Sequence, residues 1–123
     1  HKPVAELIFW QGVGGFLVYP RFSILDPETT YSLPKNQLRN GLVDAFVHVM
    51  EQYLTYPTGA VVQDRQSEAL LMTIMEIAPA VLRTDPPDYD ARASLMWVCS
   101  NALNHLIGVG VPQTGQRTAS DTN

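Results

Sequence analysis

The 123-residue sequence has a single cysteine and little charge. Cys99 alone cannot form an intramolecular disulfide or supply a cysteine-based zinc site, which favours a cytoplasmic protein. Eight basic residues against twelve acidic ones give a net charge of −4, with no basic patch for nucleic acid. The longest apolar stretch, Ala5 to Pro20, is shorter than the roughly 20 residues that a membrane-spanning helix needs. We therefore expect no signal peptide, and neither nucleic acid nor a membrane as a partner.

The organisation along the chain is that of one domain, since the length and the 46% hydrophobic content leave no room for two. Residues 1–31 contain short apolar runs (ELIFW, VGGFLVYP and FSIL) that predict strands or extended segments. From Gly108 onward, small and polar residues replace hydrophobic ones. We expect a disordered or loosely attached tail there.

A first helix is predicted over residues 34–55, where apolar side chains recur at helical spacing. Ser32 precedes it and predicts a capping hydroxyl, and Pro34 suits the first helical turn. Asn40 and Gly41 are poor helix formers in its interior. We expect them to kink this helix or to split it in two.

Two further helices are predicted, over residues 60–83 and 89–107. The first of them is apolar nearly all round, which indicates a helix that runs through the core. Pro79 lies near its end and predicts a kink or a break near Glu76. Asp88 or Asp90 is expected to cap the other helix. The sequence thus predicts a mainly α fold, a bundle-like domain of three or four helices with a short extended N-terminal element.

Asp44 and His48 are the strongest candidates for chemistry, because residues four apart lie on one helix face with Cβ atoms about 6 Å apart. A carboxylate and an imidazole so placed could hold one metal ion. Glu51 is a candidate third ligand or a hydrogen-bond partner of the imidazole. The alternative is an ordinary polar helix face. Spacing alone does not decide between them, since a catalytic metal generally needs three protein ligands.

Three other features of the sequence are candidates for functional sites. His105 is predicted near the C-terminal end of the third helix, where exposed carbonyl dipoles favour a cation. A site of Asp44, His48 and His105 would require the third helix to cross the first at that level. Cys99 lies in an apolar stripe and is expected to be a buried, inert packing residue. The stretch from Gly12 to Gly15 is expected to be a flexible turn rather than a phosphate-binding loop.

Three stretches, ILDPETTYSLP, NGLVDAFVHVMEQYLT and ALNHLIGVGVPQ, resemble iron-dependent alcohol dehydrogenases, and most closely the butanol-dehydrogenase-like aldehyde reductases. The resemblance covers residues 18–113 and implies the start of the C-terminal helical domain of a two-domain enzyme. In such an enzyme a nucleotide-binding α/β domain precedes the helical one, and a divalent metal lies between them. By this resemblance, Asp44 and His48 are the first two metal ligands.

The sequence also departs from the family. The family's two further histidine ligands follow the GVPQ segment, whereas the resemblance here stops at Gln113 and residues 114–123 contain no histidine. The nucleotide-binding domain has no counterpart in these residues. We therefore expect residues 1–17 to be a non-family segment and residues 114–123 to be a disordered tail. The metal site is expected to be incomplete, binding Fe²⁺ or Zn²⁺ weakly at most.

The function predicted from these departures is that of a truncated, non-catalytic derivative that needs no cofactor. We expect it to act as a self-associating binding or interaction module, a homodimer whose further partner is an unidentified small molecule or protein. The apolar run from Ala5 to Phe16 would cover exposed helix surface or join a second copy. The alternative is a metal-dependent, NAD(P)-linked alcohol dehydrogenase or aldehyde reductase that another chain completes.

Overall fold

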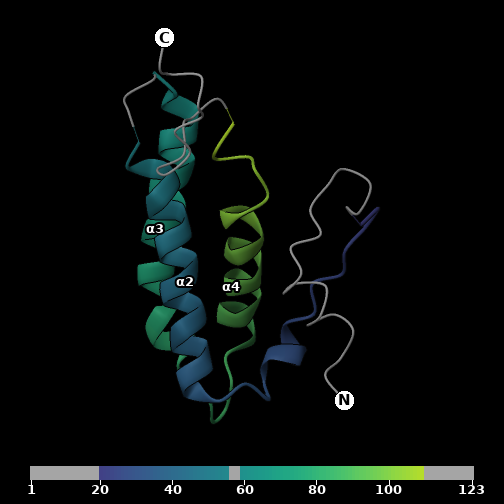
Figure 1. The fold of residues 1–123 in the computed structure, drawn as a ribbon. Coiled ribbons are helices and arrows are strands. Elements are labelled where there is room, and N and C mark those ends of the chain that lie inside the picture. Colours follow the sequence, from purple (N-terminus) through teal and green to yellow (C-terminus); the bar gives the residue numbers. More distant parts are fainter. Residues whose placement is uncertain (1–19, 56–58, 110–123) are drawn as a thin grey trace.

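The computed structural model describes residues 20–55 and 59–109, which form a short helical turn and three long helices. They are the 3-10 helix η2 (Pro27–Thr30) and the α-helices α2 (Lys35–Tyr53), α3 (Val61–Val81) and α4 (Tyr89–Ala102). The three long helices lie side by side in an up-down-up bundle, and η2 packs against the lower end of α4 (Figure 1).

The predicted mainly α class is confirmed, and within residues 20–55 and 59–109 there is no strand. The FSIL run, residues 22–25, is thus neither strand nor helix. The other predicted extended runs, with residues 1–17 and 114–123, lie outside the part of the chain that the structure describes. None of the described helices has the length and apolarity that crossing a bilayer requires.

Helix α2 begins without the predicted Ser32 cap. Its N-cap is Pro34, with φ −67° and ψ 153°, and no side chain caps the helix. The Pro34 carbonyl instead accepts the first backbone bonds, from the amides of Gln37 and Leu38. The predicted split of this helix at Asn40 and Gly41 does not occur, because α2 is continuous through both. Buried side chains on either side of them hold that stretch of helix in place and offset the poor propensity of glycine.

Helix α3 is continuous through Pro79, so the predicted break in the helix does not occur. Proline lacks the amide hydrogen that would have bonded the carbonyl of Met75. Met75 and Pro79 both lie on the exposed side of α3, where water can satisfy that carbonyl. Ile74 and Val81, which flank the proline, are 4% and 0% exposed and anchor both sides of it in the core.

Helix α4 begins as predicted and ends early. The Asp88 carboxylate accepts a 3.0 Å hydrogen bond from the Ala91 amide and so caps the helix. The helix ends at Ala102 rather than near Ile107. Beyond it, the Asn104 side chain accepts a 3.0 Å hydrogen bond from the Leu106 amide. This bond competes with the backbone hydrogen bonds that would continue the helix.

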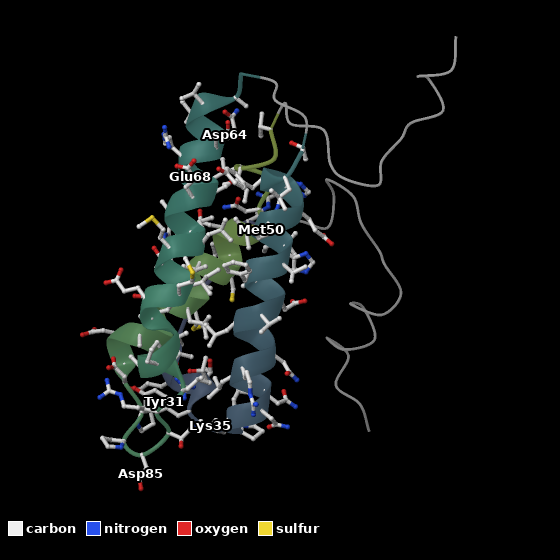
Figure 2. The ribbon with its side chains drawn as sticks, turned by 90° about the vertical axis from the view of Figure 1, so that its left-hand side faces the viewer. Tyr31, Lys35, Met50, Asp64, Glu68 and Asp85 are labelled. Atoms are coloured by element: carbon white, nitrogen blue, oxygen red, sulfur yellow. The ribbon has the colours of Figure 1, made fainter. Side chains whose placement is uncertain are left out.

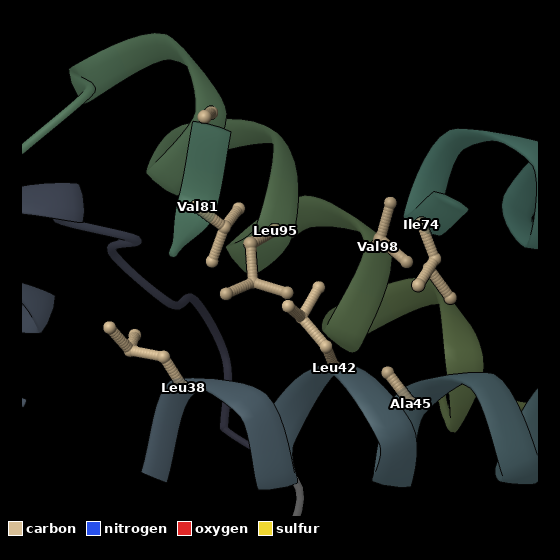
Figure 3. Packing of buried hydrophobic residues seen from close by; sticks show 8 residues of the cluster. Leu38, Leu42, Ala45, Ile74, Val81, Leu95 and Val98 are labelled. Carbon is tan, nitrogen blue, oxygen red and sulfur yellow. The ribbon is translucent and has the colours of Figure 1, made fainter. Parts of the chain in front are cut away.

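The core forms where the buried stripes of the three helices meet. Figure 3 shows the larger cluster, which consists of Leu38, Leu42, Ala45, Ile74, Val81, Ala91, Leu95 and Val98. A second cluster contains Val49, Leu71, Ala102 and Ile107. It packs the segment after α4 against α2 and α3, next to the turn of α2 that carries His48.

Candidate functional site

The Asp44–His48 pair is formed on the surface of α2. Asp44 Oδ1 lies 3.5 Å from His48 Nε2, and the two side chains are 75% and 35% exposed. The predicted geometry of a carboxylate beside an imidazole is thus present on one helix face.

Cys99 is exposed, which corrects its predicted burial. Helix α4 turns Leu95, Val98 and Ala102 into the core, and Cys99 falls at the edge of that stripe. Neighbouring chain atoms still desolvate the sulfur, and this raises the pKa of the thiol, as does the charge of Asp44 to a smaller extent. The thiol is therefore held in its neutral form, which is a poor metal ligand and a poor nucleophile.

The candidate third ligands do not join the pair. Glu51 is exposed on α2. His105, predicted on the third helix, lies instead in the loop after α4 with a left-handed backbone, φ 70°. Across residues 20–55 and 59–109, no three His, Cys, Asp or Glu side chains come together in a way that could hold a metal ion.

The donor set fits a divalent metal in kind but not in number. A carboxylate oxygen and an imidazole nitrogen are ordinary ligands of Zn²⁺ and Fe²⁺. Catalytic sites of such metals generally use three protein ligands. Asp44 and His48 would supply two ligands, one fewer than such a site needs.

Gln52 lies one turn after His48 on α2 and was not predicted from the sequence. It is 5% exposed, and its Nε2 donates to the carbonyl oxygens of His48 and Ala102, both at 2.7 Å. The signal was a polar residue that continues the apolar spacing of Leu38, Leu42, Ala45 and Val49 on α2. A polar side chain in such a stripe indicates a buried hydrogen bond.

A second polar cluster joins α2 to α3, near the end of the bundle where Figure 2 labels Asp64 and Glu68. The Tyr53 hydroxyl donates to Glu68 Oε1 at 3.0 Å, and Arg65 pairs with Glu68 Oε2. The hydrogen bond from Arg65, followed by that from Tyr53, lowers the pKa of Glu68. The bond to Glu68 raises the pKa of Tyr53. The cluster is a contact between helices α2 and α3.

Comparison with known proteins gives relatives for most of the chain, although no family model matches it. It is 53% identical over 96 residues to the NADPH-dependent aldehyde reductase YqhD of Escherichia coli, which covers 78% of this chain and 24% of that protein. It is 40% identical over 99 residues to a probable NADH-dependent butanol dehydrogenase of Bacillus subtilis, covering 80% of this chain and 25% of that protein. The chain is a homologue of the iron-dependent alcohol dehydrogenases. It spans about a quarter of the length of these curated relatives.

The fold agrees with that of the iron-dependent alcohol dehydrogenases. The substrate- and cofactor-free form of the aldehyde reductase YqhD superposes with a TM-score of 0.73 at 52% identity, over 78% of this chain and 25% of that chain. A second solved structure of E. coli YqhD gives a TM-score of 0.75 at 50% identity. The matched quarter belongs to the family's C-terminal region.

Proposed function

We propose that this chain is a helical interaction module that carries half of a divalent-metal site and by itself does not catalyse hydride transfer. The observation that supports this is the exposed Asp44–His48 pair at 3.5 Å, together with the finding that residues 20–55 and 59–109 contain no group of three His, Cys, Asp or Glu side chains that could hold a metal ion. Hydride transfer needs a nicotinamide held against the substrate carbon and a metal that polarises the substrate oxygen. Two ligands on one exposed helix position neither group.

The module is further proposed to form a homodimer in the cytoplasm. Large hydrophobic side chains are exposed on two adjacent helices, with Val43 and Val47 of α2 at 58% and 44% and Met72 and Met75 of α3 at 66% and 59%. Exposed apolar side chains can contribute to interaction surfaces. A second copy is the proposed partner, because two-fold homodimers are the commonest oligomers.

The second candidate function is that of the relatives, a metal-dependent, NAD(P)-linked alcohol dehydrogenase or aldehyde reductase, with the remaining ligands supplied by other residues or another chain. Its support is the 53% identity with an NADPH-dependent aldehyde reductase, together with the Asp44–His48 contact. In that case Asp44 and His48 would hold the metal, whose chemistry when bound is to polarise the substrate oxygen.

The test is an anaerobic titration of the protein with Fe²⁺ and Zn²⁺, followed by an NADPH oxidation assay with a simple aldehyde. The double variant Asp44→Ala/His48→Ala removes the pair. Asp64→Ala/His105→Ala is its matched control, since it removes one exposed carboxylate and one exposed imidazole elsewhere. We expect weak binding that only the pair variant abolishes, and no NADPH oxidation.

The other possible outcomes of the titration and the NADPH assay distinguish the two candidate functions. NADPH oxidation above a buffer control, absent from the pair variant, would overturn the non-catalytic proposal and establish the second function. Equal metal binding by all three proteins would make the pair an ordinary polar helix face. Sedimentation of the same samples measures the dimer, and a monomer at every concentration would overturn the self-association proposal.

A further inference from the structure

Gln52 is one of three buried polar or charged residues in the described part of the chain. It lies one turn after His48 on α2, and its amide nitrogen has two acceptors at 2.7 Å, the carbonyl oxygens of His48 and Ala102. Ala102 is the last residue of α4. A single buried amide thus connects the turn that carries His48 to the end of another helix.

This contact requires an amide. Two carbonyl acceptors use both hydrogens of the nitrogen, which also fixes the orientation of the amide group. A carboxylate in the same place would direct oxygen atoms at two carbonyl oxygens. An apolar side chain would leave the Ala102 carbonyl, one of the free carbonyls at a helix end, without this donor.

The contact lies where α2 and α4 meet beside the pair. Val49, the residue after His48, is fully buried and packs in one cluster with Ala102 and Ile107. The charge of Asp44 reaches Cys99 on α4 across the same junction. The rotation of α2 at His48 is thus fixed by packing from Val49 and by hydrogen bonding from Gln52.

We propose that Gln52 is a positioning residue for the Asp44–His48 pair. By holding the His48 turn against the end of α4, it sets the direction in which the imidazole leaves α2 and meets the Asp44 carboxylate. Gln52 itself touches no metal or substrate. The inference rests on the proposed metal half-site, of which it names a supporting residue.

The test compares Gln52→Met, which has similar length and no hydrogen-bond donor, with two controls. Gln63→Met is the matched control, because Gln63 Nε2 of α3 also donates to a backbone carbonyl, that of Val109, at 3.0 Å. Losing this hydrogen bond releases the segment after α4 but removes no bond to His48. Leu71→Ala lowers stability from within the same cluster as Val49 and Ala102. Gln52→Glu is the second variant if Gln52→Met does not fold.

Two readouts are taken from the full chain. Zinc affinity is measured by calorimetric titration, and the ring resonances of His48 are measured by ¹H–¹⁵N NMR in the metal-free protein. We expect Gln52→Met to weaken zinc binding about 10-fold, the lower end for groups that orient metal ligands. We also expect it to shift the His48 ring resonances, while Gln63→Met leaves both readouts close to wild type and Leu71→Ala changes both less than Gln52→Met does.

Unchanged His48 ring resonances in Gln52→Met would overturn the inference even if the variant is less stable. The same loss of zinc affinity in Leu71→Ala would overturn it as well, because general destabilisation would then account for the effect. A wild-type protein that binds no zinc would refute the metal half-site alone. The ring resonances would still decide whether Gln52 orients His48.

Discussion

Arg92 of α4 holds Thr30 of η2 through two hydrogen bonds, from Nη1 to the carbonyl oxygen at 2.7 Å and to Oγ1 at 3.2 Å. Its Nη2 reaches the Arg83 carbonyl at 3.4 Å, and the side chain is fully buried. The two carbonyl acceptors lie at the C-terminal end of η2 and just beyond α3, where helix dipoles favour a cation. A buried guanidinium therefore fastens η2 to the bundle.

Replacing Arg92 by alanine is expected to lower the free energy of unfolding by about 3 kcal/mol, since it removes buried hydrogen bonds and leaves a cavity. Urea unfolding measures the loss, and hydrogen exchange at Tyr31 reports the release of η2. Arg83→Ala is the control, because that side chain is exposed. A loss of stability no larger than that of Arg83→Ala would contradict the role of Arg92.

In the main core, Leu38→Ala is expected to cost about 2–5 kcal/mol of unfolding free energy, the range for a buried leucine. Leu38 is 2% exposed and lies in the cluster that Figure 3 shows. Val47→Ala, on the exposed side of the same helix, should change stability by about 0.5 kcal/mol or less. Chemical denaturation of both variants tests this, and similar losses would mean that the buried face of α2 is wrongly assigned.

The start of α4 gives a prediction about capping. Asp88→Ala should cost about 1 kcal/mol, because the carboxylate bonds the Ala91 amide at 3.0 Å. Asp88→Asn should retain most of that stability, since an amide oxygen can accept the same bond. Ser32→Ala should have almost no effect, because no side chain caps α2. Thermal unfolding compares the stability of the three variants. If Ser32→Ala lost as much stability as Asp88→Ala, the assignment of the N-caps of α2 and α4 would be contradicted.

The contact between Tyr53 and Glu68 predicts that folding stability depends on pH. The contribution of Glu68 is lost at low pH, and that of Tyr53 is lost at high pH. The pKa of Glu68 is lowered, so its contribution to stability is complete above the pKa of the unfolded chain and is lost as the pH falls through the folded value. The pKa of Tyr53 is raised, so its contribution is complete below the unfolded pKa and is lost as the pH rises through the folded value. Both contributions are small, because the groups are solvent-accessible.

Tyrosinate absorbance, assigned by comparison with Tyr53→Phe, measures this effect. Glu68→Gln removes the negative charge that disfavours the tyrosinate, so the pKa of Tyr53 should fall toward its ordinary value. A Tyr53 titration that is the same in Glu68→Gln and wild type would show that the two side chains do not interact in solution.

The sequence by itself determined the helices and the candidate pair. Apolar residues at helical spacing predicted three helices because burial of one stripe is a local, periodic property. The Asp44–His48 contact was predicted for a similar reason, since residues four apart on a helix are neighbours whatever surrounds them. Asp88 was a correct cap candidate because its partner, Ala91, is three residues away.

Tertiary structure decided the rest, because it depends on contacts between residues far apart in the chain. Packing of Ile74 and Val81 keeps α3 continuous past Pro79, and that contact is not visible in the local sequence. The bond from Gln52 to Ala102 joins positions 50 residues apart, at the point where α4 ends. The three-dimensional arrangement of α4 and its following loop also places Cys99 at the surface and keeps His105 away from the pair, which no spacing along the chain could specify.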